Sequence, residues 1–118
     1  MTDKRNVQSE ITEHVAKLTE EVFRVRGYSI DVEEIKAYTK IAISELEETQ
    51  FEILKMTYLD KLSNVGIAKE LNRTIQQVEE SFERSIFTII EKSVELYYEC
   101  ETKRLDSLNQ LLTNALLN

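Results

Sequence analysis

Apolar side chains recur at spacings of three and four along most of the chain, a pattern typical of amphipathic helices. The first run predicts a helix over residues 7–26 that ends at Gly27. Asp31 and Glu34 form a cap pair at the start of a second helix. These two helices make an N-terminal hairpin, which we expect either to pack on the rest of the domain or to serve as a partner surface. The apolar positions behind the two predictions are Val7, Ile11, Val15, Leu18, Val22 and Val25, followed by Val32, Ile35, Tyr38, Ala42 and Leu46.

Two shorter helical patterns follow the hairpin. Thr49 and Glu52 have the spacing of a capping box, so a helix should start near Gln50. Ser63 can cap the next helix, which should end at about Leu71. The buried stripe of the first of these helices is expected at Phe51, Ile53, Leu54, Tyr58 and Leu59.

The residues after this second short helix predict a tight turn into a third one. Ala68 is small enough to let the following helix cross closely, and Asn72 can adopt the left-handed conformation that closes a helix. Thr74 and Gln77 form another cap pair, and Val78 is the first apolar anchor of the third helix. A helix-turn-helix has this skeleton: a small residue, a turn four residues later and an apolar anchor six residues after that. The inward face of the third helix is expected to carry Val78, Phe82 and Ile86.

Beyond the third helix the apolar spacing continues toward the C-terminus without Gly or Pro. Either one helix of about forty residues leaves the body, or Ser107 and Gln110 cap a separate last helix. A C-terminal helix this rich in leucine should not remain exposed, so it covers the domain's own core or pairs with a second subunit. We expect a homodimer, which would suit a two-fold DNA site with half-sites about one helical turn apart. The residues predicted to form the dimer are Leu105, Leu108, Leu112 and Leu116.

The composition is typical of an almost entirely helical protein, with no Pro and only two Gly in 118 residues. A chain of this length supports a single core. We therefore predict one all-α domain with a central helix-turn-helix. Its parts are an N-terminal helical hairpin over 1–47, the helix-turn-helix over 48–92 and a long C-terminal helical extension over 93–118.

Cysteine usage and the hydropathy pattern favour the cytoplasm. Cys100 is the single cysteine, which excludes an internal disulfide, and no Cys or His cluster in the sequence could hold zinc. The first residues lack the apolar run of a secretory signal, and no window approaches the roughly 18 apolar residues of a membrane span. We expect a soluble cytoplasmic protein with no metal, no cofactor and no membrane partner.

The sequence gives little support for catalysis. His14 borders an amphipathic helix, and no local motif places a nucleophile beside it. Cys100 is better interpreted as a small core residue than as a thiolate. There is no glycine-rich phosphate loop, and the carboxylates are scattered over helix exteriors. We expect no enzymatic activity and no catalytic residue.

The net charge of −7 argues against DNA binding, because Lys and Arg usually supply most of the non-specific affinity for phosphates. The charge is spread as −3 over 1–47, −2 over 48–92 and −2 over 93–118, so the candidate DNA-reading segment is not basic. A regulator of this kind would concentrate positive charge on one face or work bound to polymerase. The alternative is a protein-interaction module whose acidic surface keeps DNA away.

The segment from Glu48 to Phe87 resembles the fourth region of bacterial sigma factors and the ArpU-type phage regulators, which are built on the same helix-turn-helix. The resemblance covers about forty residues, roughly one third of the chain. This chain departs from the family pattern at Gly66, where Glu is usual, at Arg73, where an aliphatic residue is usual, and at Glu79, where Lys or Arg is usual. The resemblance implies a bacterial or phage transcription regulator that binds double-stranded DNA, and it also implies contact with RNA polymerase. The alternative protein-interaction module would be an anti-sigma-like inhibitor that binds RNA polymerase or a sigma factor. It rests on Leu62, Ser63, Ile67, Ala68, Leu71, Asn72, Thr74, Val78, Phe82 and Arg84.

If the third helix enters a major groove, the exposed residues at its start reach base edges. Gln76 can bind adenine with two hydrogen bonds, Glu80 can accept from cytosine N4, and Ile75 can touch a thymine methyl, with Gln77 at their side. For the exposed glutamates of this helix the alternative is a solvated face, and for Arg84 it is an intrahelical pair with Glu80. The candidates for contacts with backbone phosphates are Asn64, Lys69, Arg73, Thr74 and Arg84.

Overall fold

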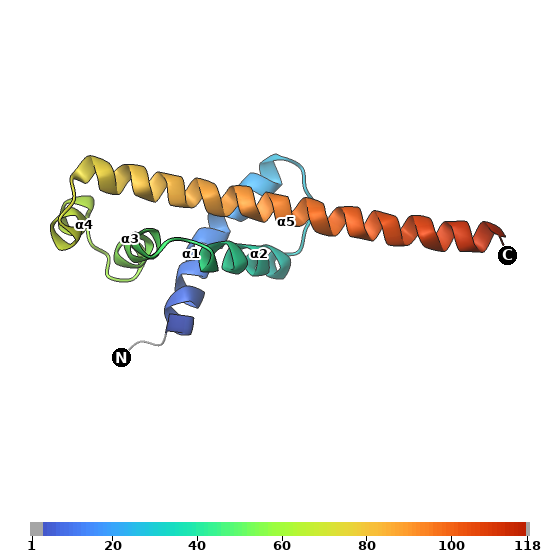
Figure 1. Ribbon diagram of the computed structural model, residues 1–118, viewed down its shortest axis with the longest axis horizontal. Helices are drawn as coiled ribbons and strands as arrows, with labels where there is room; N and C mark the ends of the chain where they lie inside the picture. Colours follow the sequence, from blue (N-terminus) through green and yellow to red (C-terminus); the bar gives the residue numbers. More distant parts are fainter. Residues whose placement is uncertain (1–3, 118) are drawn as a thin grey trace.

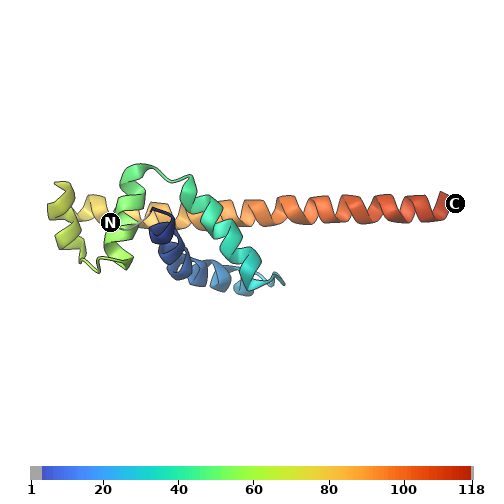
Figure 2. The ribbon, with the colours of Figure 1, turned by 90° about the horizontal axis from the view of Figure 1, so that it is seen from below.

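The structure is a computed structural model that describes residues 4–117. Over this range the chain forms five helices and no strand, so the predicted all-α fold is confirmed. The longest helix runs the length of the molecule, and the other four gather around its N-terminal part (Figures 1 and 2). The helices are α1 (Lys4–Val25), α2 (Val32–Ser44), α3 (Glu48–Tyr58), α4 (Asn64–Leu71) and α5 (Ile75–Leu117).

The main core lies between α1, α2, α3 and the middle of α5. Half-buried apolar side chains such as Leu59 and Ile86 surround it. Because both helices of the N-terminal hairpin contribute to this core, the hairpin packs against α3 and α5 instead of standing apart from them. The buried members are Val7, Ile11, Val15, Ala42, Ile43, Leu54 and Ile89.

The N-terminal hairpin turns at the residues that the sequence predicts, but the predicted side-chain cap of its second helix does not form. Gly27 follows α1 with a φ of +77°, a left-handed conformation that favours glycine, so this part of the prediction is confirmed. Asp31 occupies the predicted N-cap position of α2, but its side chain makes no cap hydrogen bond. Val32, expected in the buried stripe, is 42% exposed.

An aromatic cluster fastens the α1–α2 connection to α5. Tyr28 stacks on Tyr97 with ring centroids 4.7 Å apart, and the Tyr28 and Tyr98 hydroxyls are hydrogen-bonded to each other. Phe23 packs edge-on against both Tyr28 and Tyr97, at centroid distances of 5.4 and 5.5 Å. The predicted inward face of α1 is therefore wrong near its end, because Phe23 is buried while Val25 is 78% exposed.

Helix α3 begins two residues before the predicted start. Its N-cap is Glu47 and not Thr49: the Glu47 side chain accepts from the Gln50 backbone, and the Glu47 backbone N–H donates to Gln50 Oε1 at 3.3 Å. The pair Glu47–Gln50 has the same spacing as the predicted pair. Leu46, expected at the end of the second helix, instead lies in the α2–α3 connection and packs against the main core. This packing favours a helix start at Glu47 over one at Thr49, because it places the hydrophobic Leu46 directly before the cap.

Helix α5 is a single helix of 43 residues. Ser107 and Gln110 lie inside it, so the alternative of one long helix is confirmed and the separate capped helix does not form. The C-terminal part of α5 extends past the other helices (Figures 1 and 2), and the longest dimension of the described molecule is 68 Å. The last leucines do not cover the domain's own core. None of the five helices, over the range that the structure describes, is both long and apolar enough to cross a membrane.

Candidate nucleic-acid interface

Helix α4 and the start of α5 meet in a tight turn at the end of the molecule opposite the C-terminus (Figure 1). The Ser63 hydroxyl caps α4 by accepting the Gly66 N–H at 3.2 Å. Asn72 closes α4 with a φ of +54° and a ψ of +50°, and the Arg73 N–H then donates to the Ala68 carbonyl at 2.9 Å. The predicted cap and the predicted left-handed turn are both confirmed.

A second, smaller core holds this helix pair together. Ile53 from α3, Ile67 and Ala68 from α4, and Val78 from α5 are buried against one another. Ala68 is 7% exposed, so a larger side chain at this position would push α5 away from α4. Phe82 packs against both this core and the main one, which fixes the pair relative to the rest of the molecule.

The first turn of α5 is capped by a reciprocal pair. The Gln77 N–H donates to Thr74 Oγ1 at 3.0 Å, and the Thr74 N–H donates to Gln77 Oε1 at 2.9 Å. The predicted cap pair is therefore confirmed. Gln77 Oε1 accepts one hydrogen bond in the cap, and the side-chain NH₂ group of Gln77 can donate to another contact.

The exposed side of this first turn carries the candidate base-reading residues. Gln76 Nε2 donates to Glu80 Oε1 at 3.0 Å, and both side chains are exposed. Ile75 is 43% exposed at the first position of the helix. Since Gln76 keeps its carbonyl oxygen and one N–H free, it can still pair with the edge of a base.

Four of the predicted residues line one shallow groove of about 250 Å³ between the start of α3 and the side of α5. These are Arg73, Gln77, Glu80 and Arg84. Sequence reasoning missed the remaining lining residues, three from the start of α3, where the capping pattern was their local signal, and one from α5. They are Glu47, Thr49, Gln50 and Ser81.

The two arginines of the groove form no ion pair with its two carboxylates, Glu47 and Glu80. Arg73 and Arg84 form no ion pair with any of the residues that the structure describes. Glu47 is used in the α3 cap, and Glu80 accepts from Gln76. The alternative of an intrahelical pair between Arg84 and Glu80 is thus not formed. Two guanidinium groups of this kind suit phosphate oxygens, which they can bind with paired N–H groups.

The other predicted phosphate contacts lie outside this groove. Asn64 is the first residue of α4 and Lys69 lies in its last turn, and both are exposed. Thr74 is exposed at the cap of α5.

An exposed aromatic residue near the same helix face was not anticipated. Phe87 is 67% exposed and follows Gln76, Glu80 and Glu83 at helical spacings of four, three and four. The sequence periodicity already indicated that Phe87 is exposed, because Phe87 falls outside the inward stripe of α5 that contains Val78. This face of α5 therefore combines carboxylates with an aromatic anchor.

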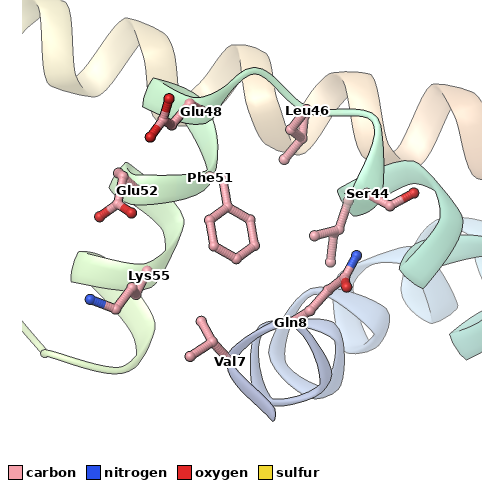
Figure 3. Close-up of a pocket in the computed structure, with 9 residues that line it drawn as sticks. Val7, Gln8, Ser44, Leu46, Glu48, Phe51, Glu52 and Lys55 are labelled. Atoms are coloured by element: carbon pink, nitrogen blue, oxygen red, sulfur yellow. The ribbon is translucent and has the colours of Figure 1, made fainter. Parts of the chain in front are cut away.

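A larger cleft of about 710 Å³ lies away from this face, between the start of α1, the α2–α3 connection and α3 (Figure 3). The Phe51 ring points into it, with the carboxylates of Glu48 and Glu52 on the α3 side. His14 is not part of it and stacks on Tyr58 at a centroid distance of 4.9 Å. Within residues 4–117 no group of three or more His, Cys, Asp or Glu side chains is placed to hold a metal ion. The lining residues are Val7, Gln8, Ile43, Ser44, Leu46, Glu48, Phe51, Glu52 and Lys55.

The departures from the sigma-like pattern do not disturb the helix pair. A Cβ added at Gly66 would meet Leu62 Cβ at 3.6 Å and Ser63 Oγ at 3.7 Å, which are ordinary contacts. Arg73 and Glu79 are exposed, so neither departure changes the small core. The chain matches no model of a known protein family, no curated protein and no solved structure.

Proposed function

We propose that this protein is a cytoplasmic transcription regulator of bacterial or phage type that binds double-stranded DNA through α4 and the start of α5. The observation that carries the proposal is the position of Arg73 and Arg84 in one groove beside the exposed Gln76. Neither arginine has an ion-pair partner in the described part of the chain. This arrangement places two guanidinium groups for phosphates near a side chain that can read a base, in a groove that Glu47 and Glu80 also line.

In this proposal the two kinds of contact have different tasks. Arg73, Arg84 and the capped start of α5 bind the DNA backbone and position the protein, since the N-terminus of a helix favours negative charge. Gln76 then pairs with the edge of an adenine in the major groove. Ile75 lies beside it and would contact the methyl group of a thymine.

The acidic character of the chain sets an expectation for affinity. Glu79 and Glu83 are exposed on the helix that would enter the groove, and carboxylates repel the DNA backbone. Binding should therefore be weak at physiological salt and tighter at low salt.

The experiment that tests the proposal is a selection from random-sequence duplexes at low salt, followed by gel-shift measurements with the enriched site. Arg73→Ala and Gln76→Ala should each abolish binding and leave the helical circular-dichroism signal unchanged. Lys103→Ala and Gln110→Ala are matched controls on the far part of α5, where both side chains are exposed, and should bind as the wild type does. Unchanged affinity in both Arg73→Ala and Gln76→Ala would refute the proposal.

A second candidate function is protein binding without DNA, for example an anti-sigma-like inhibitor that contacts RNA polymerase or a sigma factor. Phe87 favours it, because a 67% exposed aromatic residue near Glu83 could anchor a partner with a basic rim. Here Phe87→Ala should lose a complex with purified polymerase or sigma factor. In a pure DNA reader the same substitution should leave affinity for the duplex unchanged.

A further inference from the structure

The C-terminal segment of α5 is an exposed helix end with one apolar side. All residues from 105 to 117 are exposed, and Asp106 is the last charged residue of the sequence. Helical spacing places four leucines on one side of this segment. They are Leu105, Leu108, Leu112 and Leu116, with exposed fractions of 57%, 51%, 54% and 86%.

We infer that this segment pairs with the same segment of a second copy, and that the two helices run antiparallel. The leucine side offers nothing to a partner of opposite charge, because residues 107–117 carry no charged side chain. An identical apolar side, by contrast, offers leucines of matching size and no like charges at the contact. An isolated helix end with this many exposed leucines is also unfavourable in water.

The direction of the pair follows from what lies next to the free segment. Tyr98, Leu105 and Leu112 succeed one another at intervals of about two helical turns and so lie on one side of α5. At Tyr98 this side is occupied by the α1–α2 connection, through the hydroxyl contact with Tyr28 and a ring centroid distance of 5.8 Å. Arg104 and Glu34, 3.8 Å apart, add a further contact with α2 just before the free segment.

In a parallel pair the α1–α2 connections of the two copies would meet between the helices, directly beside Leu105. An antiparallel pair avoids this collision. When Leu108 lies opposite Leu112 of the second copy, Leu105 lies opposite Ala115 and Leu116, so the paired leucines lie clear of the α1–α2 connection in both copies. The four leucines can therefore pair without this collision in the antiparallel direction.

This pairing is expected to be weak and elongated. The free segment supplies about thirteen residues a side, fewer than the 20–30 of a standard interface, so dissociation should fall in the micromolar range. With 1.5 Å of rise per residue, the N-terminal ends of the two α5 helices would lie about 100 Å apart. If the proposed DNA function also holds, half-sites would be separated by about three helical turns of DNA instead of one.

The pairing itself does not depend on DNA binding, so it is tested without DNA. Sedimentation equilibrium of the full chain between about 1 and 200 µM should show a monomer–dimer equilibrium. Small-angle scattering at the upper end should give a maximum dimension near 110 Å, as expected when two molecules of 68 Å overlap by their free segments. Leu108→Asp should weaken the dimer at least tenfold, while Leu117→Asp, an exposed leucine on the other side of the helix, should not.

Both leucines are exposed, so both variants should keep the wild-type circular-dichroism spectrum. A chain that stays monomeric over the whole range, or a dimer insensitive to Leu108→Asp, would overturn the pairing. A dimer no longer than about 80 Å would overturn the antiparallel direction.

Discussion

Thr74 and Gln77 bind each other reciprocally at the start of α5, with each backbone N–H donating to the other residue's side chain at 3.0 and 2.9 Å. The pair satisfies two N–H groups that the helix leaves without internal partners. It follows directly on the left-handed Asn72, so the turn and the cap together set where α5 begins. The proposed contacts of Arg73 and Gln76 depend on this geometry.

Removing the cap should therefore destabilise the protein and loosen the proposed interface. We expect Thr74→Ala to lower the free energy of unfolding by about 1 kcal/mol in urea titrations, and Thr74→Ser to retain most of it. Thr102→Ala is the control, because Thr102 is exposed inside α5. An equal loss in Thr102→Ala would show that the effect does not come from the cap.

The two glycines should respond in opposite directions to the same substitution. A Cβ at Gly66 meets only ordinary contacts within α4, so Gly66→Ala should raise the free energy of unfolding by about 0.5–1 kcal/mol. Gly27 has a φ of +77°, so Gly27→Ala should lower it by about 1 kcal/mol, although nothing lies within 4 Å of the added Cβ. Thermal unfolding of both variants measures this, and two shifts of the same sign would contradict the account.

Tyr38 should make the protein less stable at alkaline pH. Burial raises the pKa of Tyr38, and its hydroxyl also donates to Glu34 at 3.0 Å. The unfolded chain then loses the phenol proton first, near the ordinary pKa of about 10. The stability that Tyr38 contributes is thus fully present below pH 10 and is lost as the pH rises toward the raised folded-state pKa.

Urea unfolding at pH 7 and pH 10.5 tests this contribution. Tyr38→Phe should cost about 1 kcal/mol at pH 7 through the lost hydrogen bond, and it should lose less stability than the wild type between the two pH values. Equal losses in the two proteins would mean that Tyr38 does not couple ionisation to folding.

The features that sequence reasoning predicted well are local ones. Ser63, Asn72 and the Thr74–Gln77 pair act within a few residues of chain, so their side chains carry the information directly. The same local rule failed at α3, where Thr49–Glu52 and Glu47–Gln50 have identical spacing. The packing of Leu46 against the main core, which is a tertiary contact, decided between them.

The features that were missed depend on distant contacts or on competition between side chains. Phe23 is buried because Tyr28 and Tyr97 meet it, and Tyr97 comes from the other end of the chain. Glu80 accepts from Gln76 and forms no ion pair with Arg84, although each of the two lies four residues from it, so spacing alone does not choose between them. The joining of Arg73 and Arg84 in one groove likewise required the fold.

The central claim is that the start of α5 binds DNA, and the most direct test is the salt dependence of affinity for a selected duplex, in wild type and in Arg84→Ala. The proposal predicts affinity that falls as salt rises. It also predicts that Arg84→Ala weakens binding to all duplexes alike. The slope of log affinity against log salt concentration should be smaller by about one, which corresponds to one lost phosphate contact. No binding at low salt, or an unchanged slope and affinity in Arg84→Ala, would contradict it.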